Sequence, residues 1–362
     1  MSGTAPHRTL EADPRRPQPR PAAEADGELQ DRFQDRLQDR LEDRLHDRPR
    51  DRLQDQPRYA GRLVVTGASG FLGRNLTRAF RSHALVGAAG GLRAPLIEDL
   101  GPVTEPACFD LRDPHATSRW IEAMAPDAVL HLGGNKNVRF CEEHPAEAEA
   151  VNIDGTRNVA RACRRVGAKL VYLSTDLVFD GETGGYDEQS APRPTTVYGR
   201  TKLAGEDLTL ASDGRALVCR TGGVYGADSP LLGWLGGELG AGRRVDAFQD
   251  VVSSPTSADD LAAFLDLALA ADASGILHAV GPAAVSRYEW FGTFAAVFGY
   301  DRGLVTPAVA GLRRRELLLA RNVSLDGRRT AGQLGHQAAS PRAGFERLRR
   351  AQLALPSARG VQ

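Results

Sequence analysis

Three polar side chains interrupt an apolar run in the stretch LVYLSTDLVFDG, residues 170–181. Residues 170–173 are strand formers, and Ser174, Thr175 and Asp176 follow them before apolar residues resume. One interpretation is a turn, because all three side chains bond readily to nearby backbone. The other is chemistry at the tip of a core strand.

A tyrosine and a lysine four residues apart, Tyr198 and Lys202, occur in the stretch VYGRTK. In a helix this spacing puts both side chains on one face. A free tyrosine has a pKa near 10, and bringing it to about 7 needs roughly 4 kcal/mol of differential stabilisation. A close ammonium could supply a large part of that inside a protein. The same spacing is common on ordinary surface helices, so its context decides.

A glycine-rich turn, TGASGFLG, follows the first apolar run of the globular part. Glycines at 67, 70 and 73 permit a tight turn and let a pyrophosphate approach backbone at a helix N-terminus. The spacing differs from the G-x-G-x-x-G of many dehydrogenases, and a plain turn is the alternative. The residues expected to contact a dinucleotide here are Gly67, Ser69, Gly70, Phe71, Leu72 and Gly73.

Segments with strand and helix patterns alternate from residue 61 onward. The expected strands are 62–67, 83–90, 127–134, 168–175 and 216–226, and the expected helices are 71–83, 116–126, 146–167 and 199–212. This alternation predicts an α/β fold of the Rossmann type, a doubly wound parallel sheet with helices on both faces.

The pattern becomes less regular after Gly226 and suggests a division of the chain. We expect a dinucleotide-binding Rossmann domain over residues 61–226, to which residues 251–282 return. A smaller substrate-binding region would comprise 227–250 and 283–350. Tyr288 and Trp290 could touch substrate there, but core packing is the simpler interpretation.

Residues 1–60 differ in composition from the rest. Residues 11–26 are rich in Pro, Ala, Arg and Glu, and a four-residue repeat follows in DRFQDRLQDRLEDRLHDRPRDRLQDQ. A period of four stacks like charges at i and i+4, and its apolar stripe drifts around a helix of 3.6 residues per turn. We expect a disordered tail, with a helix that forms on a partner as the alternative.

Composition excludes several classes of protein. The 362 residues carry a formal net charge of zero, which favours neither nucleic acid nor an acidic membrane as partner. No apolar run approaches the roughly 20 residues of a bilayer span, and the N-terminal stretch lacks the apolar core of a secretory signal. Four widely spaced cysteines form no C-x-x-C pair or metal pattern, so no metal site and a reduced, cytoplasmic compartment are expected.

The motifs together resemble one family. A glycine turn, a strand ending in Ser/Thr and then Tyr-x-x-x-Lys is the arrangement of the short-chain dehydrogenase/reductases, and the chain from residue 61 resembles their extended branch. Within it, STDLVFDG, YGRTKLAGE and SSPTSADDLA look like the dTDP-4-dehydrorhamnose reductase family, which binds sugar nucleotides. The resemblance implies a catalytic triad of Thr175, Tyr198 and Lys202.

The resemblance also implies cofactor contacts. Asp110 and Leu111, in CFDLRD, match the place where the family holds adenine, and Gly133 and Gly134 match small residues that line the cofactor. Asn152 matches an asparagine that braces the active-site backbone in extended members. Tyr198 and Lys202 would contact the cofactor as well.

The second strand indicates which dinucleotide binds. Sites specific for NAD carry an acidic residue after this strand, whereas ALVGAAGGLRAP has none before Glu98. Arg93, and Arg74 as a second candidate, could face a 2′-phosphate. We expect NADP(H), with NAD(H) as the alternative.

Three functions are compatible with these motifs. The first is an NADPH-dependent reductase of a nucleotide-linked 4-keto-6-deoxysugar, with the nucleotide sugar as partner and a homodimer as candidate assembly. The second is a sugar-nucleotide epimerase or dehydratase, although related dehydratases follow Thr-Asp with Glu and this chain has Leu177. The third is a non-catalytic, NADP-binding regulatory protein, because ARNVSLDGRR and YGRTKLAGE also resemble the beta subunit of methionine adenosyltransferase.

Overall fold

The computed structural model describes residues 58–80, 85–90, 105–311 and 314–354. All of the predicted tail except residues 58–60 therefore lies outside the described residues, as does Arg93. The described residues belong to one unit, Pro57–Gln362.

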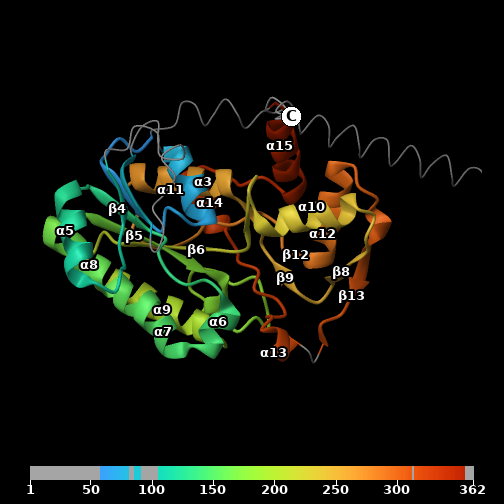
Figure 1. The fold of residues 1–362 in the computed structure, drawn as a ribbon, viewed down its shortest axis with the longest axis horizontal. Coiled ribbons are helices and arrows are strands. Elements are labelled where there is room, and N and C mark those ends of the chain that lie inside the picture. The colour runs from blue at the N-terminus through green and yellow to red at the C-terminus, as the bar shows by residue number, and fades with distance from the viewer. Residues whose placement is uncertain (1–57, 81–84, 91–104, 312–313, 355–362) are drawn as a thin grey trace, which may run out of the picture. The chain divides into compact units, whose positions relative to one another are not determined.

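A seven-stranded sheet carries the fold (Figure 1). Its strands are β1 (Leu63–Thr66), β2 (Leu85–Gly90), β3 (Glu105–Cys108), β4 (Ala128–His131), β5 (Lys169–Thr175), β6 (Leu217–Thr221) and β11 (Gly275–His278). Their order is β11-β6-β5-β4-β1-β2-β3, and every neighbouring pair is parallel. The predicted doubly wound parallel sheet is confirmed.

The strand order reverses between β1 and β4, which are paired from Leu63↔Ala128 to Thr66↔His131. Connections from these two strands leave toward opposite sides of the sheet. A crevice outside the carboxyl ends of the strands forms at such a point, and ligands of open α/β sheets bind there. The residues that follow β1 and β4 therefore border the expected ligand site.

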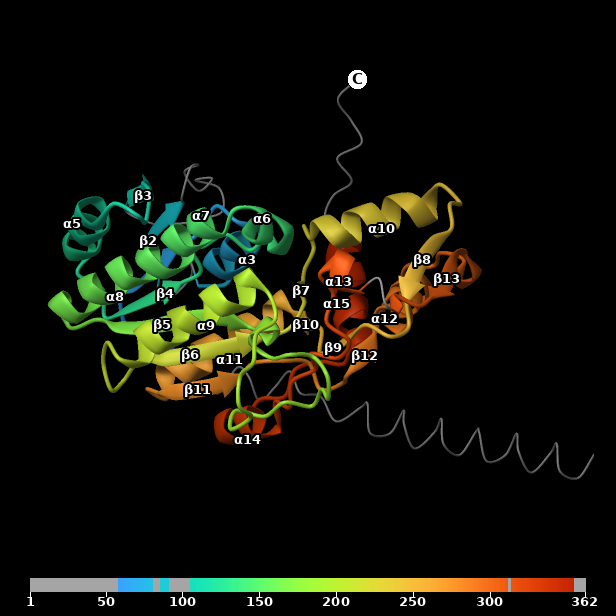
Figure 2. The same ribbon diagram turned by 90° about the horizontal axis from the view of Figure 1, so that it is seen from below.

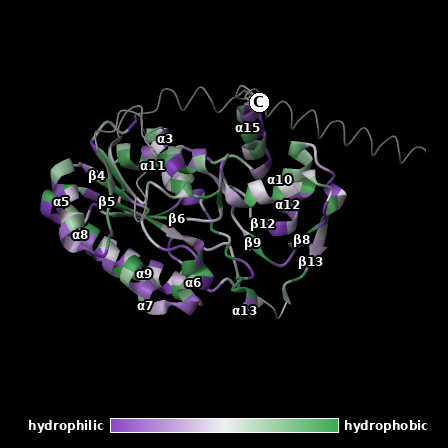
Figure 3. Cartoon of the chain, viewed as in Figure 1, coloured by the Kyte–Doolittle hydropathy of each residue, from purple (hydrophilic) through white to green (hydrophobic). Residues whose placement is uncertain are grey.

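Helices cover both faces of the sheet. Helices α3 (Phe71–Phe80) and α11 (Ala258–Ala270) lie on one face, and α5 (Pro114–Met124), α8 (Gly155–Val166) and α9 (Val197–Leu210) lie on the other (Figures 1 and 2). The outer helices α5 and α8 mix hydrophilic and hydrophobic residues (Figure 3), as expected of helices with one face on the sheet and one in water. No helix of the described ranges is long and apolar enough to cross a membrane.

Side-chain caps fix where several of these helices begin. Asp113 accepts from His115 and Ala116 at the start of α5, and Thr196 accepts from Gly199 at the start of α9. Such caps satisfy backbone N–H groups that the first turn of a helix leaves without partners. They place the beginning of α9, and with it Tyr198, directly at the edge of the sheet.

The remaining elements are mostly short. The helices are α6 (Val138–Glu143), α7 (Pro145–Glu149), α10 (Pro230–Gly240), α12 (Arg287–Phe298), α13 (Arg314–Leu317), α14 (Arg328–Leu334) and α15 (Pro341–Ala354). The strands are β7 (Val224–Tyr225), β8 (Val245–Phe248), β9 (Val252–Ser253), β10 (Thr256–Ser257), β12 (Val285–Ser286) and β13 (Val305–Ala308). The short strands form three two-stranded sheets, β10-β7, β12-β9 and β13-β8.

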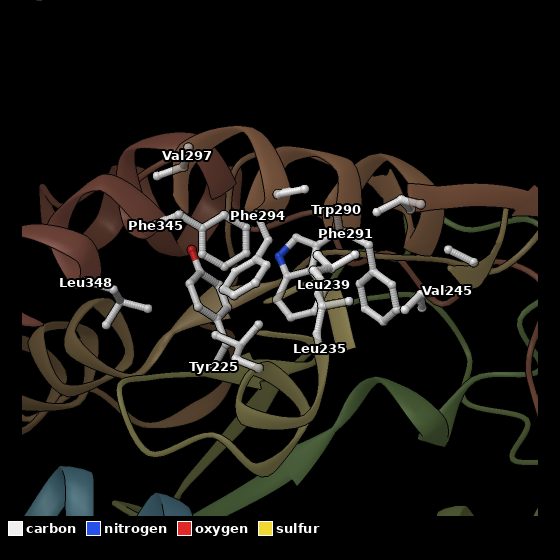
Figure 4. Packing of buried hydrophobic residues seen from close by; sticks show 14 residues of the cluster. Tyr225, Leu235, Leu239, Val245, Trp290, Phe291, Phe294, Val297, Phe345 and Leu348 are labelled. Atoms are coloured by element: carbon white, nitrogen blue, oxygen red, sulfur yellow. The ribbon is translucent and has the colours of Figure 1, made fainter. Parts of the chain in front are cut away.

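A separate hydrophobic cluster holds the C-terminal elements together (Figure 4). Phe345 of α15 lies between Tyr225, Trp290 and Phe294, with ring centroids 5.0, 5.4 and 5.4 Å away. Trp290 is 8% exposed within this cluster, which agrees with the core interpretation of that residue. Tyr288 packs against the cluster and is partly buried.

Two predicted elements are wrong in detail. The single helix expected over 146–167 is divided into α7, a π-helical turn (Ala150–Asp154) and α8. The strand expected over 216–226 is divided into β6 and β7, and these belong to different sheets. Strand β7 pairs with β10 instead of continuing β6 in the central sheet, and the π turn carries Asn152.

Candidate active site

The polar residues at the end of β5 have three different surroundings. Ser174 donates to Glu206, whose carboxylate also holds Arg220 at 2.6 and 2.9 Å, and all of these groups are buried. Thr175 caps the turn that follows, because its hydroxyl accepts from the Leu177 N–H at 3.2 Å. Successive side chains of a strand point to opposite faces, so Ser174 and Thr175 cannot serve the same site.

Tyr198 lies one residue inside α9, and its hydroxyl is close enough to Thr175 for that hydroxyl to influence its pKa. The close approach of α9 to the end of β5 requires Gly199, because a Cβ there would stand 2.2 Å from the Leu177 carbonyl oxygen. The sequence thus brings the two predicted hydroxyl groups together. Burial, followed by the Asp176 carboxylate, raises the pKa of Tyr198 well above its usual range, while the Thr175 hydrogen bond opposes the shift.

Lys202 is buried below Tyr198 on the same helix. Its ammonium donates to the Leu173 carbonyl oxygen at 2.7 Å and lies 3.8 Å from the centroid of the Tyr172 ring. Burial lowers the pKa of Lys202 to about 7, and Glu206 opposes that shift. The expectation that its ammonium lowers the pKa of Tyr198 is wrong for this structure, because the charge is directed to Tyr172 and Leu173.

Asp176 is a third titratable group at this site. It is 7% exposed, and its Oδ1 lies 3.0 Å from the Thr175 hydroxyl. Burial raises the pKa of Asp176 to about 7, against hydrogen bonds from Thr175 and from backbone N–H groups.

The glycine turn lies between β1 and α3, at the point where the strand order reverses. Gly67 has φ +73°, and a Cβ on Gly73 would stand 2.2 Å from the Gly67 carbonyl oxygen, so both positions require glycine. At Gly70 the nearest atom would be 3.4 Å away. Ser69, Phe71 and Leu72 complete the turn and the first residues of α3, whose N–H groups have no acceptor within the helix.

The predicted residues after β3 and β4 meet beside this turn. A Cβ on Gly133 would be 2.4 Å from the Leu111 side chain, and one on Gly67 would be 2.7 Å from the Gly133 nitrogen. Gly134 has φ +158° and faces the Asn152 amide. Asp110 is held by Arg112 at 2.5 to 3.0 Å, and this bond keeps the pKa of Asp110 below its usual range.

Asn152 connects the loop after β4 to α9. Its Oδ1 accepts from the Asn135 N–H at 2.7 Å, and its amide nitrogen donates to the Asn135 carbonyl at 3.0 Å and to Thr201 at 2.9 Å. The side chain is 1% exposed and braces the backbone at the site, as expected from its match to the family. The π turn around Asn152 is the kind of irregularity that is frequent at functional sites.

The structure assigns Arg74 to a different contact from the expected one. Its guanidinium binds Asp228 at 2.9 and 3.2 Å and the Ser69 carbonyl at 2.9 Å, and Asn75 binds the same carboxylate at 2.7 Å. These bonds join α3 to the loop before α10. Arg93 is thereby the remaining candidate for a 2′-phosphate, and it lies outside the described residues.

Sequence reasoning missed Lys136. Its ammonium lies 5.7 Å from the centroid of the Phe71 ring, at the N-terminus of α3. Burial, followed by the charge of Arg74, lowers its pKa. A signal was present, because the chain has 46 lysines and arginines and only Lys136, Lys169 and Lys202 are lysines. Among the described residues, no three side chains of His, Cys, Asp or Glu gather as a metal site would require.

Comparison with known proteins identifies similar sequences. The family model described as RmlD substrate binding domain matches residues 61–348. A dTDP-4-dehydrorhamnose reductase of Mycobacterium tuberculosis is 40% identical over 258 residues, which cover 68% of this chain and 78% of that protein. Methionine adenosyltransferase 2 subunit beta of Xenopus laevis is 32% identical over 167 residues, 46% of this chain and 47% of that protein.

A solved structure has the same fold. The dTDP-4-dehydrorhamnose reductase of Bacillus anthracis, crystallised in complex with NADP, superposes with a TM-score of 0.69. The match covers 80% of this chain and 99% of that one at 24% sequence identity. At this identity the likeness establishes the fold alone.

Proposed function

The chain belongs to the RmlD substrate binding domain family, and on this premise we propose that it is an NADPH-dependent reductase of a nucleotide-linked 4-keto-6-deoxysugar. The relative of 40% identity, named dTDP-4-dehydrorhamnose reductase, supports an NAD(P)-dependent oxidoreductase of this type. The observation that carries the proposal is the proximity of the Thr175 and Tyr198 side chains, which brings two hydroxyl groups to the carboxyl end of the sheet.

The residues around the glycine turn fit a dinucleotide. The open side of Gly70, the N–H groups of Phe71 and Leu72 and the ammonium of Lys136 would hold a pyrophosphate, since backbone donors and cations attract phosphate at a helix N-terminus. Gly133 and Gly134 leave room beside them, and Asp110 and Leu111 would border the adenine. The cofactor, when bound, supplies a hydride. NADP in the Bacillus anthracis structure supports the choice of NADP(H), with NAD(H) as the alternative.

The chain's own residues supply the proton and the orientation. Thr175 would hydrogen-bond the carbonyl oxygen of the substrate and hold it against Tyr198. Tyr198 would donate its proton to that oxygen as it becomes an alkoxide, and its raised pKa keeps it protonated until then. Lys202 would hold the ribose of the cofactor, and Asn152 would keep the loop after β4 in place.

Leu177 favours reduction over dehydration. A dehydratase must take a proton from C5 and give one to the C6 hydroxyl, so it needs acid–base groups beyond the triad. Leu177 can transfer no proton, and Asp176 alone can hardly serve both steps. A reductase needs one hydride and one proton, and Tyr198 provides the proton.

One pair of assays tests the proposal. With NADPH and a 4-keto-6-deoxy sugar nucleotide, the purified protein should oxidise the cofactor, followed by absorbance. With NADP⁺ and dTDP-glucose it should form no 4-keto-6-deoxy product. Dehydration of dTDP-glucose would overturn the reductase assignment. Inactivity in both assays would favour a binding protein like the beta subunit of methionine adenosyltransferase.

The proposal also covers which regions of the chain bind the cofactor and the substrate, where the protein is located and how it assembles. Residues 61–226 and 251–282 would bind the cofactor, and 227–250 with 283–350 would bind the substrate. A cytoplasmic location fits the widely spaced cysteines. A homodimer is the proposed assembly, and light scattering on the purified protein would test it.

A further inference from the structure

Asp176 is a buried carboxyl group that the proposed reduction does not use. It is 7% exposed, and its Oδ1 lies 3.0 Å from the Thr175 hydroxyl. The other oxygen faces the backbone of Gly222, where a Cβ would stand 3.5 Å away. One proton from Tyr198 completes the reduction, so the chemistry described above leaves Asp176 without a task.

The hydrogen-bond capacity of Thr175 links Asp176 to Tyr198. A hydroxyl has one proton to donate and two lone pairs to accept with. The Leu177 N–H occupies one lone pair at 3.2 Å. A protonated Asp176 would donate to the second, which leaves the Thr175 proton for Tyr198. An ionised Asp176 would instead compete for that proton. The protonation state of Asp176 therefore sets the direction in which Thr175 donates.

Electrostatics couple the two ends of this chain of hydrogen bonds. Burial raises the pKa of Asp176 to about 7, so a proton is available near neutral pH. The Asp176 carboxylate in turn raises the pKa of Tyr198. A phenolate at Tyr198 and a carboxylate at Asp176 are both negatively charged and repel each other. The negative charge of the phenolate therefore attracts the proton of Asp176.

Other titratable groups lie near Asp176 and Tyr198. Lys202 of α9 has its pKa lowered by burial to about 7, and Cys141 of α6 has its pKa raised by burial. From the segment after β6, the backbone of Gly222 faces the Asp176 carboxylate. Lys202 changes charge over the same pH range as Asp176, so an experiment must separate the two.

We propose that Asp176 returns a proton to Tyr198 through the Thr175 hydroxyl after each reduction, which rests on the reductase function proposed above. Hydride reaches the carbonyl carbon, the C=O π electrons move to oxygen, and that oxygen takes the Tyr198 proton. The Tyr198 phenolate takes the Thr175 proton while Thr175 takes the proton of Asp176. Asp176 is left as a carboxylate, and water reprotonates it. Asp176 acts through Thr175 and is a positioning residue.

The decisive variant is Asp176→Asn, whose amide can still donate to Thr175 but cannot give up a proton. Tyr198 begins each reaction protonated, so the first turnover should proceed at nearly the wild-type rate. Later turnovers should be slower by about 10- to 100-fold, because the phenolate is no longer refilled. Stopped-flow absorbance should show a burst of about one NADPH per active site, with the Kd of NADPH unchanged. Asp180→Asn is the matched control and should show no burst.

The pH profile separates Asp176 from Lys202. In the wild type, kcat should fall above about pH 7 with the slope of two ionisations, because repeated turnover needs the Asp176 proton in addition to charged Lys202. In Asp176→Asn the fall should have the slope of one, contributed by Lys202. A variant with wild-type steady-state turnover and wild-type slope would overturn the proposal. Slowing of the first turnover by the same factor as later ones would also overturn it, because it indicates a structural role.

Infrared difference spectra provide a readout without substrate. The wild type with NADP⁺ should show a protonated carboxyl band at pH 6 that disappears at pH 8.5 and is absent from Asp176→Asn. If that variant fails to fold, the wild-type titration still decides, because a protonated carboxyl band that persists at pH 8.5 would also contradict the proposal. An ionised Asp176 at pH 6 would contradict the proposal. Wild-type protein without reductase activity would contradict the proposed function instead.

Discussion

Gly73 lies so close to Gly67 that a Cβ on Gly73 would stand 2.2 Å from the Gly67 carbonyl oxygen and 2.6 Å from the Ala68 Cα. Both atoms belong to the backbone of the turn and cannot move aside alone. Gly73→Ala should therefore destabilise the protein by about 1–3 kcal/mol or more, measured as the free energy of urea unfolding. Gly70→Ala is the control, because its Cβ would have 3.4 Å of space, and it should lower NADPH affinity without this loss of stability. Equal stability of the two variants would contradict the argument.

Tyr198→Phe should bind NADPH almost as tightly as the wild type and lose most turnover. The change removes the proton donor and leaves the ring in place, so kcat should fall by roughly 100- to 10,000-fold. Cofactor fluorescence and steady-state kinetics measure the two effects. Tyr172→Phe is a useful comparison, because that ring packs under Lys202 instead of facing the carbonyl. A Tyr198→Phe enzyme with unchanged kcat would refute the assigned proton donor.

Lys136→Met should weaken cofactor binding. The ammonium lies 5.7 Å from the Phe71 ring centroid at the N-terminus of α3, where a pyrophosphate would bind. Loss of one charge-assisted contact of about 1–2 kcal/mol raises the Kd of NADPH roughly 5- to 30-fold. Adenosine 2′,5′-bisphosphate, which has no pyrophosphate, should bind equally well to both proteins. Arg139→Met removes a neighbouring exposed cation and should change neither affinity.

Glu206→Gln should destabilise the fold strongly. Glu206 and Arg220 each have side chains 2% exposed, and the substitution leaves the guanidinium without its counter-charge. Removing one partner of a buried ion pair typically costs about 3–5 kcal/mol of unfolding free energy. The matched control is Glu122→Gln, which breaks an exposed pair with Arg165 and should have little effect in the same urea titration. Similar losses in both variants would show that burial of the pair is not the cause.

Deletion of residues 1–57 should leave the thermal midpoint and NADPH affinity unchanged. The described contacts begin at Tyr59, whose N–H donates to Asp266 at 3.0 Å. Deletion through residue 62 should be destabilising, because it also removes the Arg62 bonds to Asp127, Met124 and Ala125. Loss of cofactor binding in the shorter deletion would show that the tail takes part in the fold.

Much of the fold could be predicted from the sequence because its signals are local. Apolar runs at β1, β4 and β5 predict strands that are buried on both faces, and the glycines of TGASGFLG mark the turn that only they permit. The spacing of Tyr198 and Lys202 places both on one helix by backbone geometry alone. Family resemblance then identified Thr175 as their partner, and the structure brings it to Tyr198.

The tertiary structure alone decided what these residues contact. Asn152 binds Asn135 and Thr201, which are 17 and 49 residues away, and the helix predicted through it contains a π turn. Lys202 is directed to Tyr172 instead of Tyr198 because its ammonium donates a hydrogen bond to the Leu173 carbonyl oxygen. Periodicity follows from the backbone geometry of neighbouring residues. Hydrogen bonds, burial and pKa values depend on distances between atoms from separate elements, which only the packed sheet and its helices establish.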